Sequence, residues 1–301
     1  MKIDEYINTP NILNLDNIIT LYKYEQYVLS LQDITQSIIY LPINLEILEH
    51  SNICDIFQNF KNKIIMLTCA DIDFPPPKKP YSYDTYFNNY NLPKEHENIN
   101  YYDKISIELI KIIENNNLYI FAHSISINHP RLNIVPLSIY NKFNHFHLKT
   151  NNKYILCYGN FGLCIDRWYG NPRNNTYQQI KNKQFITIDN IQSNVNILSQ
   201  ENYYYKLSCS KFAICPRGCG IDTYRLWDCI CLGCIPIIIK YDCHNNEIYQ
   251  KLPILYINDY NQLTEAFLIN SYNDFLLRDY DYSSLLFENI YRRLQIFNNI
   301  L

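Results

Sequence analysis

The chain has 301 residues, of which 48% are hydrophobic and 18% charged, and its formal net charge is −3. This apolar content suffices for a sizeable core and excludes an intrinsically disordered protein, and the length predicts about two domains. The weak negative charge excludes the broad basic surface that non-specific nucleic-acid binding needs, so we expect no nucleic-acid partner.

The N-terminal half alternates predicted strands with a predicted helix. Lys63–Cys69 is continuously apolar, which is typical of a strand buried on both faces. The Pro-rich segment Phe74–Pro80 predicts a loop, because Pro lacks an N–H donor and has a fixed φ. Asp103–Glu114 has helical spacing of its apolar residues, and strands are predicted at Leu118–Ala122 and Leu132–Pro136. This alternation indicates the α/β class.

A polar segment, Phe143–Asn152, interrupts this pattern and predicts a boundary between an N-terminal domain at 1–145 and a C-terminal domain at 146–301. The alternation then restarts, so two α/β domains would face each other across a cleft. Packing of the last helices back on the N-terminal domain is left open. In chain order the predicted elements are a strand at Tyr154–Tyr158, a segment at Asn175–Lys183, a strand at Phe185–Ile188, a helix at Glu201–Ser208, a strand at Lys211–Cys215, a helix at Thr223–Leu232, strands at Ile235–Lys240 and Ile254–Ile257, and helices at Tyr260–Ile269 and Ser283–Phe297.

Two general features predict where the protein resides. No apolar run reaches the roughly 18 residues of a membrane helix, and the first residues carry acids and Asn where a signal peptide would be apolar. The 11 cysteines are odd in number, and several fall in apolar stretches where a thiol behaves as a small hydrophobe. We therefore expect a cytoplasmic protein with no transmembrane segment.

The segment Lys211–Lys240 concentrates the chemically suggestive residues. Its first strand is ended by Pro216, and the loop Arg217–Gly220 follows, with two glycines that permit positive φ. Asp222 or Thr223 would cap the next helix. A Gly-rich turn between a strand's carboxyl end and a helix N-terminus is a common binding place for phosphate and diphosphate groups.

Arg225 and Asp228 lie three residues apart on one face of that helix. A guanidinium suits a diphosphate and a carboxylate suits ribose hydroxyls. The structural alternative is an intrahelical ion pair, worth a few tenths of a kcal/mol. The spacing alone does not decide between the two.

The pattern CPRG-x-G-x-D-T-x-R-x-W-D-x(4)-G-x-I-P, from Cys215 to Pro236, resembles the C-terminal signature of exostosin-type glycosyltransferases and their relatives in large DNA viruses. The resemblance implies a GT-B fold, with two Rossmann-like domains, the donor on the C-terminal one and the acceptor on the N-terminal one. Asp228 stands where that family has Glu. The matching residues are Cys215, Pro216, Arg217, Gly218, Asp222, Arg225, Trp227, Gly233 and Pro236.

The resemblance also implies which residues hold the nucleotide sugar. The segment Tyr158–Arg173 resembles the family's strand and loop that supply a basic residue to the diphosphate, with Arg173 preferred over Arg167. The backbone of the Gly-rich loop and the arginines would stabilise charge on the leaving diphosphate. The implied binding residues are Arg173, Arg217, Gly218, Gly220, Asp222, Thr223, Arg225 and Asp228.

The general base is sought in the N-terminal domain. Asp71 and Asp73 follow the buried strand and would face the cleft from the acceptor side. An Asp-x-Asp is also the Mn²⁺–diphosphate motif of the GT-A fold, but in the GT-B interpretation no metal is required. His123 is the third catalytic candidate, and His129 is its alternative. His145 and His147 with Cys157 lack the usual ligand spacing for zinc.

Three hypotheses follow for the function. The first is a glycosyltransferase moving a sugar from a UDP- or GDP-linked donor to a hydroxyl of a glycan or protein, in the host cytosol or the virion. The second is a non-catalytic nucleotide-sugar or glycan-binding relative. The third and weakest is a dinucleotide enzyme, because the loop lacks the G-x-G-x-x-G spacing. The sugar, the acceptor and the stereochemistry are left open.

Overall fold

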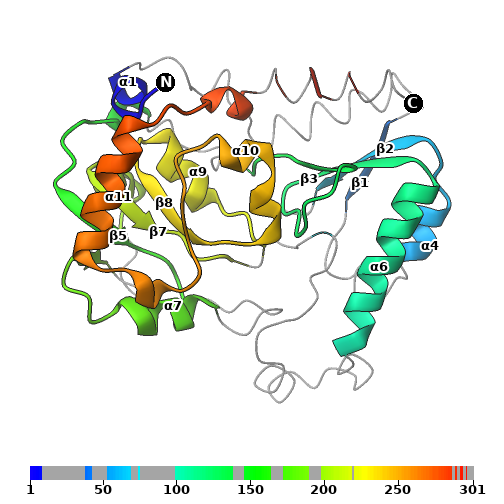
Figure 1. Cartoon of the computed structure of the whole chain (residues 1–301), viewed down its shortest axis with the longest axis horizontal. Helices are drawn as coiled ribbons and strands as arrows, with labels where there is room; N and C mark the ends of the chain where they lie inside the picture. The colour runs from blue at the N-terminus through cyan, green and yellow to red at the C-terminus, as the bar shows by residue number, and fades with distance from the viewer. Residues whose placement is uncertain are drawn as a thin grey trace.

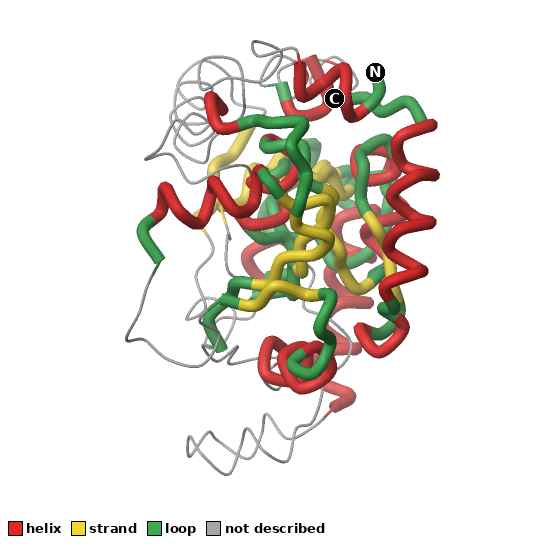
Figure 2. Tube along the Cα trace, turned by 90° about the vertical axis from the view of Figure 1, so that its left-hand side faces the viewer, coloured by secondary structure: helices red, strands yellow, loops and turns green. Residues whose placement is uncertain are grey.

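The computed structural model describes residues 1–8, 38–42, 53–68, 74, 99–137, 146–163, 172–189, 198–218, 220–286, 289, 292–293 and 296. Two parallel sheets, one in each half of the chain, form its framework (Figure 1). The strands lie in the interior with the helices around them (Figure 2). This confirms the predicted α/β class with a parallel sheet in each half, and the GT-B assignment stays a prediction. None of the described helices is both long and apolar enough to cross a membrane.

The N-terminal sheet contains four described strands in the order β1-β2-β3-β4, all parallel. The middle of β2, residues 64–67, is fully buried, as its continuous apolar run predicted. Successive strands advance in one direction, and right-handed crossovers then place the connecting helices on one face. Accordingly α4 packs against α6 (Figure 1). The elements of this half are β1 (Ile38–Pro42), α4 (Ile53–Gln58), β2 (Lys63–Thr68), α6 (Ile99–Asn115), β3 (Leu118–Ala122) and β4 (Leu132–Ile134).

The C-terminal sheet has the order β6-β5-β7-β8-β9, also parallel throughout. From β5 the chain first moves outward to β6 and then returns past β5 to β7, so its direction reverses. Right-handed crossovers predict α7 on one face and α8 with α9 on the other, and α8 does contact α9. The elements are β5 (Ile155–Gly159), α7 (Pro172–Ile180), β6 (Ile186–Ile188), α8 (Gln200–Ser208), β7 (Ser210–Ile214), α9 (Tyr224–Cys231), β8 (Ile235–Ile239), α10 (Glu247–Gln250), β9 (Leu255–Ile257) and α11 (Glu265–Leu277).

The first helix, α1 (Ile3–Asn8), packs on the C-terminal half. The Tyr6 hydroxyl donates to the Cys231 carbonyl at 3.0 Å, and its ring stacks on Tyr282 with centroids 4.0 Å apart. Gly233 ends α9 with a φ of +69°, and a Cβ there would lie 2.4 Å from Cγ1 of Ile7. The helix C-terminus therefore needs glycine both for its backbone conformation and for the room that α1 occupies.

The last described residues contact the N-terminal sheet. The Arg293 guanidinium donates to the Ile134 carbonyl and to Oδ1 of Asn133, each at 3.1 Å, and lies 5.8 Å from the Phe121 ring centroid. The two ends of the chain thus each pack on the opposite half. The boundary at 145/146 stays a prediction. A short 3₁₀ helix, Phe146–Leu148, lies within the predicted linker.

Most predicted elements are present within three residues of their expected ends. The helix expected from Asp103 begins four residues earlier, at Ile99, and two C-terminal elements differ more. The helix expected at Tyr260–Ile269 is wrong: a 3₁₀ turn, Tyr260–Gln262, is followed by the separate helix α11. The Asp259 carboxylate closes that turn by accepting from the Asn261 N–H, and Thr264 begins α11 by accepting from Phe267 N–H. Of the helix expected at 283–297, only part is described, starting with a 3₁₀ turn at Tyr282–Leu285.

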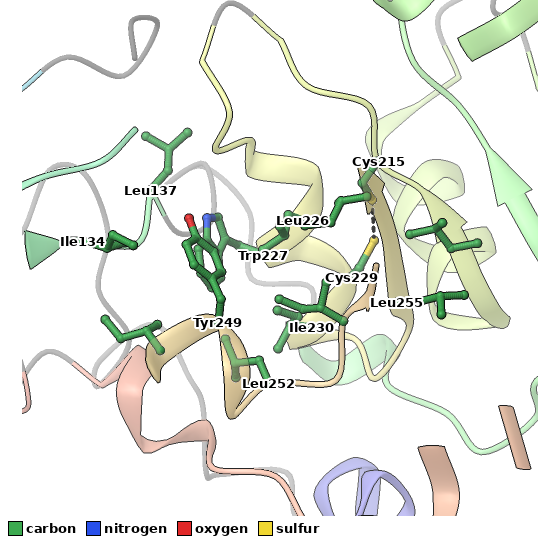
Figure 3. Close-up of a cluster of buried hydrophobic side chains, with 14 of the residues drawn as sticks. Ile134, Leu137, Cys215, Leu226, Trp227, Cys229, Ile230, Tyr249, Leu252 and Leu255 are labelled. Atoms are coloured by element: carbon green, nitrogen blue, oxygen red, sulfur yellow. Dashed lines mark hydrogen bonds between the residues drawn. The ribbon is translucent and has the colours of Figure 1, made fainter. Parts of the chain in front are cut away.

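A buried cluster spans the contact between the halves (Figure 3). It brings Ile134 and Leu137 of the N-terminal half next to Trp227 and Tyr249 of the C-terminal half. The described cysteines are free and buried, in agreement with their predicted role as small hydrophobes. Within this cluster Cys215 Sγ and Cys229 Sγ lie 3.5 Å apart.

Candidate functional site

The reversal of strand order between β5 and β7 defines the candidate site. In open parallel sheets, ligands bind outside the carboxyl ends of the two strands where the order reverses. The segments that leave these ends are Asn160–Leu163 after β5 and Cys215–Asp222 after β7. The second of these is the Gly-rich loop that the sequence singled out. Among the described strands of the N-terminal sheet no such reversal occurs.

Arg173, in the first turn of α7, joins the two segments. Its Nε donates to the Arg217 carbonyl at 3.2 Å and its Nη1 to the Gly162 carbonyl at 3.4 Å. The guanidinium lies directly over Gly218, where a Cβ would come within 2.9 Å of Nη2. The structure therefore places the first-choice arginine at the Gly-rich loop, with a cation beside the glycine backbone. Arg167 lies outside the described residues.

The side chain of Arg217 stabilises the Gly-rich loop by contacts with Gly218 and Tyr241. This side chain is mostly buried, with Nε donating to the Gly218 carbonyl at 3.4 Å and the guanidinium 5.7 Å from the Tyr241 ring centroid. The Gly218 N–H donates to the Gly220 carbonyl at 3.1 Å, which closes the turn. Arg217 thus stabilises the loop's shape and its junction with the end of β8.

Arg225, in the first turn of α9, is framed by two aromatic rings. Its guanidinium carbon is 6.0 Å from the Phe161 centroid and 5.9 Å from the Tyr203 centroid. Its Nε is buried, and none of the described residues accepts a hydrogen bond from it. Burial lowers its pKa, but Tyr203, Cys215 and other neighbours more than offset this, so the net shift is upward and the group stays charged. A charged guanidinium with an unused donor beside the reversal point suits an anionic ligand.

Asp228 lies one turn further along α9 and is only 5% exposed. Its Oδ1 accepts no hydrogen bond from the described residues, and burial raises the pKa of the carboxyl to about 7, against the lowering effect of Arg225. No ion pair between Arg225 and Asp228 is formed in the described part of the chain, so the intrahelical pair considered above is wrong for this structure. The carboxyl is buried beside α8 rather than displayed at the loop.

The sequence predicts that Asp222 or Thr223 caps α9, but the structure shows other partners for Asp222 and no capping hydrogen bond from the Thr223 side chain. The Asp222 carboxylate accepts from the Leu137 N–H at 2.8 Å and from Trp227 Nε1 at 2.6 Å, and the side chain is 3% exposed. Thr223 occupies the N-cap position of α9, but its side chain makes no capping hydrogen bond. The Asp222 carboxylate turns inward, because it meets donors that only the tertiary fold brings near. Its implied part in nucleotide-sugar binding stays a prediction. Trp227 is a buried packing residue, as expected, with its ring stacked on Tyr249.

The candidates for the general base lie in the N-terminal half, and the structure describes only some of them. His123, at the end of β3, is fully buried, and its Nδ1 lies 2.9 Å from the Val135 carbonyl, which can only accept, so Nδ1 carries the proton. Burial lowers its pKa to about 4, which makes it a weak base at neutral pH and argues against its predicted catalytic role. Asp71 and Asp73 lie outside the described residues. His129 is held in a turn by the Arg131 N–H and by Glu114.

Sequence reasoning missed the aromatic residues around Arg225. Phe161 and Tyr203 were not singled out, because the chain contains 29 Tyr and 14 Phe and a single aromatic residue carries little information. The one available signal is the run Tyr203–Tyr205 within the predicted helix at Glu201–Ser208. As to metals, the described residues contain no group of three or more His, Cys, Asp or Glu side chains that could hold an ion.

No protein-family model matches the sequence, and no curated protein is similar to it. Among solved structures, the crystal structure of an alpha1,3-fucosyltransferase aligns over 88% of this chain and 91% of that chain, at 12% sequence identity and a TM-score of 0.38. A likeness at this TM-score is too loose to bear on function.

Proposed function

We propose that this protein is a glycosyltransferase that takes a sugar from a nucleotide diphosphate sugar and transfers it to a hydroxyl of a glycan or protein. The observation that carries the proposal is the placement of two guanidinium groups, Arg173 and Arg225, at the two segments that flank the reversal point of the C-terminal sheet. The motif resemblance at residues 215–236 supports the same site.

The geometry suits a leaving diphosphate. As the acceptor oxygen bonds to the anomeric carbon, the bond from that carbon to the diphosphate breaks and negative charge grows on the phosphate oxygens. Fixed cations and backbone N–H groups stabilise such charge best when they are positioned in advance. Arg173 is held by two carbonyls and Arg225 lies between two rings, so both are oriented before a ligand binds. In this proposal a divalent metal is not required, and Mn²⁺ is the alternative.

A second candidate function is non-catalytic binding of a nucleotide sugar or glycan on the same fold. The observation that favours it is the burial of His123, the catalytic candidate that the structure describes. A binding protein needs the donor site but no base, whereas a transferase must remove the proton of the acceptor hydroxyl.

Nucleotide binding tests the shared part of both candidates. Isothermal titration with UDP, GDP, CMP, dTDP and ADP is expected to show binding of one nucleotide, weakened at least about tenfold by Arg225→Ala. Arg278→Ala is the matched control, because Arg278 packs on Phe275 at the end of α11, away from the loop. Absence of binding by every nucleotide would overturn the proposal.

Turnover separates the two candidates. With the sugar donor of the nucleotide that binds, a transferase releases nucleoside diphosphate in the presence of a hydroxyl acceptor. Tight binding with no release, over a panel of glycan acceptors, would favour the non-catalytic relative.

A further inference from the structure

We propose that Asp222 is a positioning residue that fixes the Gly-rich loop and the start of α9 against the N-terminal half of the protein. Its effect on ligand affinity rests on the function proposed above, whereas its effect on structure does not. The inference comes from two hydrogen bonds and from what anchors their other ends.

The first bond crosses between the halves. Oδ2 of Asp222 accepts from the backbone N–H of Leu137, which follows β4, at 2.8 Å. Both residues are buried, at 3% and 2% exposure, so water does not compete for the bond. A hydrogen bond to a buried carboxylate is among the stronger ones in proteins.

The N-terminal end of this bond is rigid. Val135, two residues before Leu137, donates its N–H to the Ala122 carbonyl at 2.9 Å, and its own carbonyl accepts from His123. The Ile134 carbonyl accepts from Arg293. The segment that meets Asp222 is therefore tied to β3 and to the last described residues, and it cannot follow the loop if the loop moves.

The second bond stays within the C-terminal half. Oδ1 of Asp222 accepts from Nε1 of Trp227 at 2.6 Å, and the indole is stacked on Tyr249, with centroids 5.9 Å apart. Figure 3 shows Leu137, Trp227 and Tyr249 gathered at this contact. Because Arg225 lies between Asp222 and Trp227 in sequence, the carboxylate spans the turn of α9 that presents Arg225.

The chemistry of the two partners explains why a carboxylate is suited to this place. Both partners are N–H donors, and a carboxylate offers an acceptor oxygen to each. An amide of the same size offers one acceptor and one NH₂ group, so Asn would set a donor against a donor. The predicted result of Asp222→Asn is a loop and helix start that are no longer held in one orientation.

A second carboxylate, exposed where Asp222 is buried, offers a control at the same interface. Oδ2 of Asp242 accepts from the backbone N–H of Asn128 at 2.7 Å, a second carboxylate-to-backbone bond between the halves. Asp242 lies in the 3₁₀ turn after β8, outside the Gly-rich loop. Asp242→Asn therefore weakens the interface without touching the loop.

The test compares Asp222→Asn with Asp242→Asn in the full chain, by UDP and GDP titration and by tryptophan emission. Trp168→Phe leaves Trp227 as the only tryptophan. We expect Asp222→Asn to weaken nucleotide binding at least about tenfold and to shift Trp227 emission, and Asp242→Asn to change affinity less than about twofold with no shift. Equal losses of affinity in both variants, or none in Asp222→Asn, would overturn the inference.

Two further measurements keep the outcome decisive. If Asp222→Asn does not fold, Trp227→Phe removes one donor and keeps the stacking on Tyr249; unchanged nucleotide affinity in it would contradict the inference. If no nucleotide binds the unmodified protein, the proposed function fails, and hydrogen exchange tests the positioning alone. The Leu137 amide and the loop at 217–222 should then exchange faster in Asp222→Asn than in Asp242→Asn, and equal rates would refute the positioning role.

Discussion

The two parallel sheets differ in one respect that decides where a ligand can bind. In the N-terminal sheet the described strands follow chain order, so the order of these strands does not reverse. In the C-terminal sheet the order reverses between β5 and β7, and the segments leaving these strands separate. The Gly-rich loop and both candidate arginines gather there. Strand order, more than composition, therefore decides which half of the protein holds the candidate site.

The largest expected effect concerns Gly233, which ends α9 in the C-terminal half and lies against α1. Gly233→Ala would impose a Cβ at positive φ and against Ile7, and we expect it to lower the free energy of unfolding by about 3 kcal/mol. The control is Gly159→Ala, where the new Cβ would meet only ordinary contacts at 3.6–3.8 Å, so its expected effect is small. Urea unfolding measures both. Equal effects would mean that α1 does not depend on Gly233.

Acid stability compares the halves directly, because among the described residues each half contains a buried histidine. Burial lowers the pKa of His123 to about 4 and that of His244 to about 3. The unfolded chain binds protons at these residues below about pH 6.5, so stability is complete above that pH and is lost as the pH falls. Between pH 7 and pH 5 each histidine should lower the free energy of unfolding by about 2 kcal/mol.

Asparagine variants separate the two contributions. In His123→Asn the amide can still donate to the Val135 carbonyl, and in His244→Asn the oxygen can still accept from the Tyr241 N–H. Each should flatten the loss of unfolding free energy between pH 7 and pH 5. If only one variant does so, the other histidine is not buried in its neutral form.

The candidate site itself predicts an opposite pH dependence. Burial raises the pKa of Asp228 to about 7, above its unfolded value, so its contribution to stability is present at low pH and is lost as the pH rises through 7. Relative to the unmodified protein, the free energy of unfolding of Asp228→Asn should rise by roughly 1 kcal/mol between pH 6 and pH 8. Urea unfolding at the two pH values measures this. A difference that does not change with pH would show that the carboxyl titrates normally.

The smallest expected effect concerns ion pairs. In the C-terminal half Lys206 Nζ lies 2.6 Å from Asp189 Oδ2. In the N-terminal half His129 Nε2 lies 3.2 Å from Glu114 Oε1, a pair that carries opposite charges only when the imidazole is protonated. Both pairs are partly exposed, so Lys206→Gln and Glu114→Gln should each cost about 0.5 kcal/mol or less, and the cost should shrink at high salt. A cost above about 2 kcal/mol at Lys206 would indicate a buried structural pair instead.

Much of the fold could be predicted from the sequence. The strand at Leu118–Ala122 has its predicted ends, and the strand, Gly-rich loop, helix and strand between Lys211 and Lys240 follow in the predicted order. Continuous apolar runs, Pro and Gly positions and helical spacing are local signals, and local signals determine elements. They failed at 260–269, where the Asp259 turn and the Thr264 cap divide one expected helix in two.

The candidate site could be predicted only in part. Arg173 contacts Gly218 and Arg225 lies beside Phe161, near the reversal point, but their part in ligand binding stays a prediction. The hydrogen-bond partners of Asp222 and His123 were not predictable. Asp222 bonds to Leu137, which lies 85 residues away, and His123 becomes buried under a strand that follows it. A side chain's partner depends on which elements pack together, and short-range patterns carry no record of that.

The sequence by itself determined the α/β class, the Gly-rich loop and the presence of two charged residues at the start of α9. Only the tertiary structure decided the strand order, the packing of α1 on the C-terminal half and the inward turn of the Asp222 carboxylate. The physical reason is the distance along the chain over which each property is determined. Backbone conformation follows from neighbouring residues, whereas the burial and partners of a polar group follow from contacts between segments far apart in the chain.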